Sequence, residues 1–235
     1  MNTPLVFLPG MMCDGRLFGP QVEVLSVIRS VSCGELVAAD RIGALAEDAL
    51  SRAPDLFALA GLSMGGIVAM EVLRRAPERV AGLALMDTNP LAELPDVAAR
   101  RGPQMERART GGLYSVMQDE MKPNYLAKGD RRGEVLDLCM EMAMDLGPNV
   151  FCRQSIALRD RPDQTAVLAE SRVPTLVLCG REDALCPVSR HEFMHELIPG
   201  STFTIIEGAG HLPTLEKPQE TTAALARWLK DVDNE

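Results

Sequence analysis

The fold of this chain is decided by residues 61–66, which read GLSMGG. They follow an apolar run, Phe57–Ala60, and open a segment with helical apolar spacing, Met64–Ala76. A Gly-x-Ser-x-Gly sequence between a buried strand and a helix is the pattern of a tight, strained turn that lifts the serine side chain above a sheet. Side chains at positions 61 and 65 would collide with neighbouring backbone there, so both must be very small. The alternative interpretation is a glycine-rich turn whose serine caps the helix.

Short apolar runs recur along the chain, each bounded by turn residues. Besides Phe57–Ala60 they are Leu5–Leu8, Val80–Met86, Val173–Cys179, Thr202–Ile206 and, more weakly, Val31–Val37. Runs that are apolar on both faces are typical of strands buried in a parallel sheet. Segments with helical spacing lie between most of them: Ile42–Arg52, Met64–Ala76, Val188–Leu197 and Gln219–Lys230. The alternation predicts an α/β fold with a mostly parallel central sheet of about six strands and helices on both faces.

One interval between strands is too long for a single crossover helix. It separates Val80–Met86 from Val173–Cys179, and residues 90–165 within it have helical composition and no convincing strand. We expect four short helices there, near Val97–Arg109, Leu113–Met121, Arg132–Asp145 and Pro148–Leu158. The predicted organisation is therefore a core of residues 1–89 and 166–235 with a helical lid of residues 90–165. A lid over the carboxyl ends of the strands would gate access and exclude water.

A serine nucleophile needs a base, and the chain has three histidines, His191, His195 and His211. His191 and His195 are four residues apart on a predicted helix, with glutamates beside them, so we expect a solvated helix face. His211 stands in the glycine-rich sequence EGAGHLP, just after the last predicted strand. A loop of this kind allows close approach to the serine turn. His211 is therefore the predicted base.

The base needs a carboxylate that fixes its tautomer and stabilises its charged form. Asp183 follows the strand Val173–Cys179 and is the preferred candidate. Asp87, just past Val80–Met86, is a real alternative because it also ends a strand near the serine turn. Glu207 is too close in sequence to the histidine. The resulting chain order, serine, aspartate, histidine, is the one expected for a hydrolase with this turn.

Two backbone amides must stabilise the oxyanion that forms when a serine attacks a carbonyl carbon. One should belong to Met64, the residue after the serine. The other should come from the loop after the first strand, where Pro9-Gly10 permits a sharp turn, and we assign it to Met11.

Four motifs together resemble the α/β-hydrolase superfamily: LPGM (8–11), GLSMGG (61–66), GRED (180–183) and GAGH (208–211). The resemblance covers essentially the whole chain. It implies a serine hydrolase with a helical cap between the sixth and seventh of the family's eight strands. Carried over residue by residue, Ser63 matches the nucleophile, Asp183 the acid and His211 the base, and Met11 and Met64 match the oxyanion donors.

The chain departs from this superfamily in two ways. Relatives often carry His-Gly where this chain has Pro9-Gly10, but the donor is the next backbone amide and should persist. The chain also starts at what would be the family's third strand, so we expect the N-terminal antiparallel hairpin to be missing. We therefore expect the strand order 4-3-5-6-7-8 in family numbering. The exposed edge of such a sheet is one that a partner subunit could cover, so a homodimer is one expectation.

Methionines and arginines are candidates for substrate contacts. Six of the 13 methionines lie in residues 90–165, and flexible methionine side chains adapt to varied ligands. The candidate pocket residues are Met12, Met117, Met121, Met140 and Met144, with ordinary core packing as the alternative. Arginines cluster at positions 100, 101, 107 and 109. Arg100, Arg101, Arg107 and Arg109 would either meet an anionic substrate or carrier or form a solvated face.

Composition excludes several classes of protein. The 235 residues carry a net charge of −9 with a pI near 5.0, and an acidic chain without a basic tract argues against a surface for nucleic acid or anionic membrane. No apolar run reaches the roughly 18–20 residues that span a bilayer. The N-terminus shows no secretory signal, and the six cysteines form no CxxC pair, so we expect free thiols in a reducing cytoplasm. We find no motif for a metal, nucleotide, flavin or pyridoxal cofactor.

The function expected is hydrolysis of carboxylic esters of small to medium substrates through an acyl-enzyme on Ser63. Three alternatives share the fold: thioester hydrolysis or acyl transfer, cleavage of a carbon–carbon bond, including hydroxynitrile lysis, and a non-catalytic ligand receptor. Epoxide hydrolases and haloalkane dehalogenases of the superfamily use an aspartate nucleophile. The serine at position 63 therefore disfavours those two chemistries.

Overall fold

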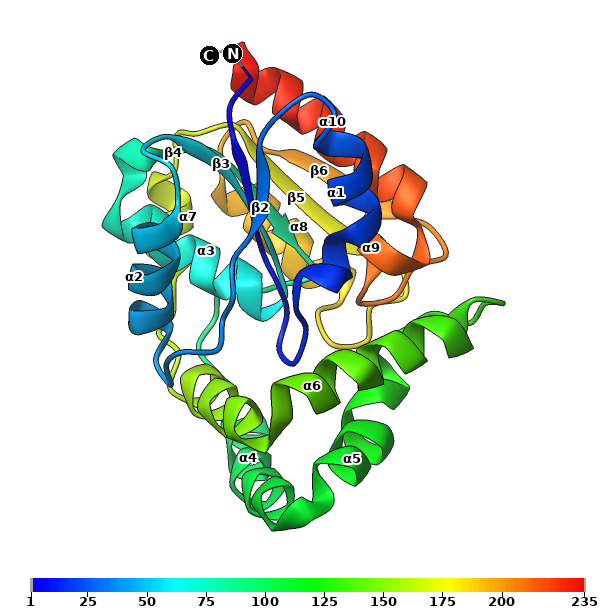
Figure 1. Ribbon diagram of the computed structural model, residues 1–235. Helices are drawn as coiled ribbons and strands as arrows, with labels where there is room; N and C mark the ends of the chain where they lie inside the picture. The colour runs from blue at the N-terminus through cyan, green and yellow to red at the C-terminus, as the bar shows by residue number, and fades with distance from the viewer. Residues whose placement is uncertain (1, 235) are drawn as a thin grey trace.

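A computed structural model of the protein describes residues 2–234. Its centre is a six-stranded sheet in the order β2-β1-β3-β4-β5-β6, and every neighbouring pair of strands is parallel (Figure 1). The strands are β1 (Leu5–Leu8), β2 (Val31–Cys33), β3 (Phe57–Leu62), β4 (Val80–Met86), β5 (Thr175–Gly180) and β6 (Thr202–Ile206). This order is the predicted 4-3-5-6-7-8, so the expected fold class is confirmed.

The inner strands are buried on both faces, as their continuous apolar runs predicted. All side chains of β1, β3 and β5 are buried, whereas the two edge strands β2 and β6 are partly exposed. Strand β2 is shorter than the predicted Val31–Val37, because the chain leaves the sheet after Gly34 donates its backbone N–H to Phe7. The edge at β2 is open in this single chain, and a homodimer stays a prediction.

Helices form a layer on each face of the sheet (Figure 1). One layer holds α2 (Ile42–Arg52), α3 (Met64–Arg75), α7 (Thr165–Glu170) and α8 (Val188–Leu197); the other holds α1 (Gly19–Leu25), α9 (Pro213–Glu216) and α10 (Pro218–Asp233). The sequence predicted α2, α3, α8 and α10. It missed α1, α7 and α9, which have seven residues or fewer and are too short for a periodic pattern to emerge.

Residues 90–165 form helices beyond the carboxyl ends of the strands (Figure 1). They contain α4 (Pro95–Arg107), α5 (Leu113–Ser115) between two π-helical turns, Ala108–Gly112 and Val116–Met121, and the long α6 (Arg132–Arg159). The two helices predicted within α6 follow one another directly. Only Gly147, with a φ of 76°, breaks the helical geometry before Pro148. None of the helices in residues 2–234 combines the length and hydropathy needed to cross a bilayer.

Candidate active site

The turn between β3 and α3 has the strained geometry that its glycines predict. Ser63 has a φ of 54° and a ψ of −115°, a conformation that costs energy for a residue with a side chain. A Cβ on Gly61 would lie 2.3 Å from the carbonyl oxygen of Gly65, and a Cβ on Gly65 would lie 1.9 Å from that of Leu8. Both positions therefore require glycine. The turn is held by hydrogen bonds, including one from the Thr88 hydroxyl to the Ser63 carbonyl at 2.7 Å.

The close approach of α3 to β1 gives a stability prediction. We expect Gly65→Ala to lower the free energy of unfolding by about 3 kcal/mol or more, because the clash is with backbone that cannot rotate away. Gly102→Ala is the matched control: Gly102 lies in α4 with nothing within 4 Å of the added methyl, and alanine there should stabilise by about 0.5–1 kcal/mol. Urea unfolding measures both. Equal midpoints for the two variants would contradict the predicted clash.

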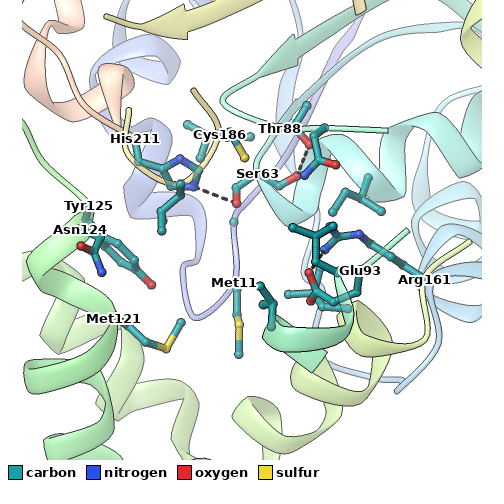
Figure 2. Close-up of a pocket in the computed structure, with 18 of the residues that line it drawn as sticks. Met11, Ser63, Thr88, Glu93, Met121, Asn124, Tyr125, Arg161, Cys186 and His211 are labelled. Carbon is teal, nitrogen blue, oxygen red and sulfur yellow. Dashed lines mark hydrogen bonds and ion pairs between the residues drawn. The ribbon is translucent and has the colours of Figure 1, made fainter. Parts of the chain in front are cut away.

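Ser63, His211 and Asp183 form one hydrogen-bonded chain (Figure 2 shows the first contact). The Ser63 Oγ lies 2.9 Å from Nε2 of His211, and the His211 Nδ1 lies 2.8 Å from Oδ2 of Asp183. A carboxylate accepts a hydrogen bond from the protonated Nδ1, which leaves Nε2 unprotonated and able to accept a hydrogen bond from the serine hydroxyl. Although burial raises the pKa of Asp183, His211 and the backbone N–H groups of Leu185 and Cys186 outweigh it and lower the pKa below its usual value.

Asp87, the alternative acid, lies close to Asp183 but has a different environment. Its side chain is fully buried, its Oδ1 accepts the Gly180 N–H at 2.9 Å, and its backbone has a φ of 45°. Burial, and then the negative charge of Asp183, raise the pKa of Asp87 well above its usual value. Of these two neighbouring carboxyl groups, Asp183 is therefore the more readily ionised and Asp87 the more readily protonated. Glu207 is exposed and pairs with Arg181 at 2.7 Å.

The loop that carries the histidine is fixed by Glu216, which the sequence analysis did not single out. The Glu216 carboxylate accepts backbone N–H groups from Gly210 and Leu212, each at 3.0 Å, and from Ala127 at 2.8 Å. The His211 N–H donates to the carbonyl of Tyr125 at 2.7 Å. Residues 125–127 and the histidine loop are thus tied together. The only hint in the sequence was a glutamate a few residues after the histidine.

The two predicted oxyanion donors border the serine. Met64 is the first residue of α3, and a Cβ on Gly10, next to Met11, would lie 3.5 Å from the Ser63 Cβ. Among residues 2–234 neither the Met11 nor the Met64 amide has a hydrogen-bond acceptor. The following amide, of Met12, donates to Oε1 of buried Gln154 at 2.8 Å. Gln154 thereby anchors the loop from α6, a role that the sequence analysis missed.

The sequence predicted that His191 lies on a solvated helix face, and the structure places it in the interior instead. Its side chain is fully buried, and its Nε2 accepts the Thr88 backbone N–H at 3.1 Å. Burial lowers the pKa of His191 to about 4, so the ring is neutral and supports the turn after β4. The prediction was wrong because α8 presents this residue to the sheet, which the flanking glutamates concealed. His195 is partly exposed and contacts Ser201 at 2.7 Å.

A cavity of about 340 Å³ opens beside Ser63 and His211. Figure 2 shows Met11, Met121 and Tyr125 around it, with Glu93 and Arg161 on the other side in this view. The predicted methionine pocket requires correction, because Met121 alone of the five candidates lines the cavity. Met12, Met117, Met140 and Met144 pack in the hydrophobic core, and Met140 and Met144 also border a separate surface hollow. The helices turn their methionines toward the sheet and each other.

Three of the buried groups could also serve as metal ligands by distance. Ligand atoms of Asp183, Cys186 and His211 lie within 4.8 Å of one another. However, the histidine and the aspartate already bond each other, and burial raises the pKa of the Cys186 thiol, which therefore keeps its proton. The donor set suits a hydrogen-bonded chain better than a metal.

Comparison with known proteins identifies the family. A model of the alpha/beta hydrolase family matches residues 5–225. A thermophilic esterase from Thermogutta terrifontis, solved with malate bound, is 30% identical over 99% of this chain and 91% of its own, with a TM-score of 0.91. An enol-lactonase from Burkholderia xenovorans LB400 is 22% identical over 98% and 92%, with a TM-score of 0.85, and shares the fold. A pimeloyl-(acyl-carrier protein) methyl ester esterase from Aliivibrio salmonicida is 25% identical over 99% of this chain and 94% of its own. The chain belongs to the alpha/beta hydrolase family.

Proposed function

We propose that the protein hydrolyses carboxylic esters of small to medium size through an acyl-enzyme on Ser63. The observation that carries the proposal is the 2.9 Å contact between Ser63 Oγ and His211 Nε2 at the wall of a cavity. The similarity to an esterase from Thermogutta terrifontis and to a methyl ester esterase from Aliivibrio salmonicida supports an ester as the substrate.

The proposed mechanism follows from the hydrogen bonds that link Ser63, His211 and Asp183. His211 Nε2 takes the proton of Ser63 as the oxygen attacks the ester carbonyl, and the ionised Asp183 stabilises the resulting imidazolium. The carbonyl oxygen becomes an oxyanion, which the amides of Met11 and Met64 stabilise. As the intermediate collapses, the alcohol leaves with the proton from His211. A water molecule then gives its proton to His211, attacks the acyl-enzyme and releases the carboxylic acid, and the serine recovers its proton.

We propose that residues 90–165 act as a lid, with the core formed by residues 1–89 and 166–235. The bonds from residues 125–127 to Glu216 and His211 support this role, since they connect the helical segment directly to the base. Tyr125 is buried and borders the cavity beside the histidine. A lid seated in this way keeps bulk water from the reacting atoms.

The test is a burst experiment. Mixing the protein with p-nitrophenyl acetate should release one equivalent of p-nitrophenol per chain quickly, followed by slower turnover. A sulfonyl fluoride should abolish turnover and add one label on the peptide that contains Ser63. Turnover of thioesters or of carbon–carbon substrates with no ester turnover would favour the alternative chemistries, and labelling without any turnover would favour a receptor.

The size of the cavity predicts a preference for short acyl groups. Its volume is at the low end of the roughly 300–1,000 Å³ that ligand pockets span. We expect kcat/KM to vary little between acetyl and hexanoyl p-nitrophenyl esters, and to fall by about tenfold or more for the palmitoyl ester, which the cavity cannot enclose. A maximum at the palmitoyl ester would contradict this prediction. Assays below the micelle concentration of the longer esters provide the control.

A further inference from the structure

Four arginines and two glutamates line the cavity that holds Ser63, and one of these arginines, Arg100, is exposed. We call Arg101, Arg161, Arg190 and Glu93 the arginine cluster. The Glu93 carboxylate accepts a hydrogen bond from Arg101 Nε at 2.8 Å and forms an ion pair with Arg161 Nη1 at 3.1 Å. All three of these side chains are nearly buried, with exposed fractions of 11% for Arg101, 9% for Arg161 and 6% for Glu93. Arg101 belongs to α4 and Arg190 to α8. Glu93 just precedes α4, and Arg161 lies between α6 and α7.

The cluster has more positive charge than its own carboxylate can balance. Burial lowers the pKa of Arg161, and although Glu93 opposes this effect, the positive charges of Arg101 and Arg190 lower it further. Elsewhere the chain treats buried charge differently: two arginines, Arg74 and Arg75, share the buried Glu71, but both are substantially exposed to water. In the arginine cluster Arg101 and Arg161 share the nearly buried Glu93, and the half-buried Arg190 adds a third positive charge to the same cavity wall.

The guanidinium N–H groups of Arg190 are available as hydrogen-bond donors to a ligand in the cavity. Its side chain is half-buried and lines the cavity, and among residues 2–234 its guanidinium meets no ion-pair partner and no hydrogen-bond acceptor. The cavity's other acid, Glu120, is engaged by Arg107 at 2.6 Å and by Gln104 at 2.9 Å. A guanidinium presents its N–H groups in a fork that matches a carboxylate. A ligand that bonds to the free donors of Arg190 is therefore expected to be a carboxylate.

We propose that the arginine cluster binds a carboxylate that the ester substrate carries away from its reacting bond, with Arg190 as the principal donor. The proposal rests on the proposed esterase function, and it narrows the substrate class to half-esters of dicarboxylic acids or esters of hydroxy acids. In this arrangement the ester carbonyl would lie at Ser63 and the free carboxylate at the cluster. Figure 2 shows Ser63, Glu93 and Arg161 around the same cavity. An anion there supplies the charge that Glu93 alone does not.

The experiment compares charged esters with neutral esters of the same shape. In one arm the carboxylate is on the acyl part: monomethyl succinate, glutarate and adipate are each compared with the methyl ester in which isopropyl replaces the carboxylate. In the other arm it is on the alcohol part, in the acetate esters of glycolate and 3-hydroxypropanoate, with the same replacement. We expect kcat/KM to favour the charged member by roughly tenfold or more in one arm, and that arm identifies the part that carries the charge.

Substitutions at position 190 test the cluster itself. Arg190→Gln should remove most of the preference for the charged ester, and Arg190→Lys should restore part of it, because a point charge remains without the fork. Arg227→Gln is the matched control, since it removes one exposed arginine charge from α10, outside the cavity, and should leave the preference unchanged. Raised salt should weaken the preference in the wild-type protein only modestly, because the site is largely buried.

Two results would overturn the inference. One is a wild-type protein with no preference for the charged ester in either arm, and the other is a preference that Arg190→Gln leaves intact. Turnover of p-nitrophenyl acetate that depends on Ser63 is measured in parallel. If that turnover is present and the preference is absent, the carboxylate site fails while the esterase proposal stands; if both are absent, the esterase proposal fails.

Discussion

Replacing Ser63 by alanine is expected to lower kcat for p-nitrophenyl acetate by roughly 10⁴-fold or more. The variant loses the hydroxyl oxygen that lies 2.9 Å from His211 Nε2, so no acyl-enzyme can form. The protein should remain folded, because the turn is held by backbone contacts and by the Thr88 hydroxyl, whereas the Ser63 hydroxyl bonds to His211. Single-turnover kinetics with a melting curve for the same preparation measures both expectations.

A second serine provides the control for this experiment. Ser51 lies on α2 and its hydroxyl donates only to the carbonyl of Asp48 at 2.7 Å. Ser51→Ala should retain wild-type kcat and wild-type labelling by a sulfonyl fluoride. Ester turnover by a clean Ser63→Ala preparation at more than about one-hundredth of the wild-type rate would rule out Ser63 as the nucleophile.

The exchange of Asp183 for asparagine should cost roughly 10⁴-fold in kcat at neutral pH. Asparagine would offer an amide to His211 Nδ1, which holds the proton on Nε2 and leaves the imidazole unable to accept the serine proton. The pKa of Asp183 is lower in the folded protein than its usual value. The stability that the ionised side chain gives the folded protein is therefore present above the usual carboxyl range and is lost as pH falls through the folded-state pKa. Rates of both proteins measured between pH 5 and pH 8 by the same ester assay check the size of the effect.

Asp87→Asn is the matched comparison for this prediction. Because burial and the charge of Asp183 favour the protonated form of Asp87, an asparagine of the same shape resembles that form and still accepts the Gly180 N–H. We expect a loss of less than about tenfold, as for a lost or weakened hydrogen bond that does not touch the reacting atoms. If the ranking were reversed, with Asp87→Asn the more damaging change, Asp87 would be the acid of the triad.

The features that local sequence controls could be predicted. A strained turn with very small neighbours leaves its mark as glycines around Ser63, and buried parallel strands leave continuous apolar runs. Both are properties of short segments, so they predicted a mostly parallel sheet of about six strands and the positions of Ser63, Asp183 and His211 after its strands. The order of the strands was implied by the resemblance to the α/β-hydrolase superfamily. The choice between Asp183 and Asp87 needed the structure, because both residues end neighbouring strands and only the direction of the side chains separates them.

The cavity could not be predicted in the same way. Which methionines face a cavity depends on how α4, α5 and α6 pack against one another, and that is settled by contacts between distant segments. His191 shows the same limit, since its neighbours in sequence are charged while its neighbours in space are β4 and Thr88. Gln154 and Glu216 act only through backbone amides of remote loops, so nothing near them in sequence indicates their roles.

The bonds made by Glu216 link the proposed lid to the base of the triad. Its Oε1 accepts the backbone N–H groups of Ala127 in the helical segment and of Gly210 in the histidine loop, and the Tyr125 carbonyl accepts the backbone N–H of His211. A movement of residues 125–127 away from the core would have to break these bonds, and the histidine loop would lose two of the contacts that position it. We therefore expect that changes in residues 125–127 alter the position of His211 as well as access to the cavity.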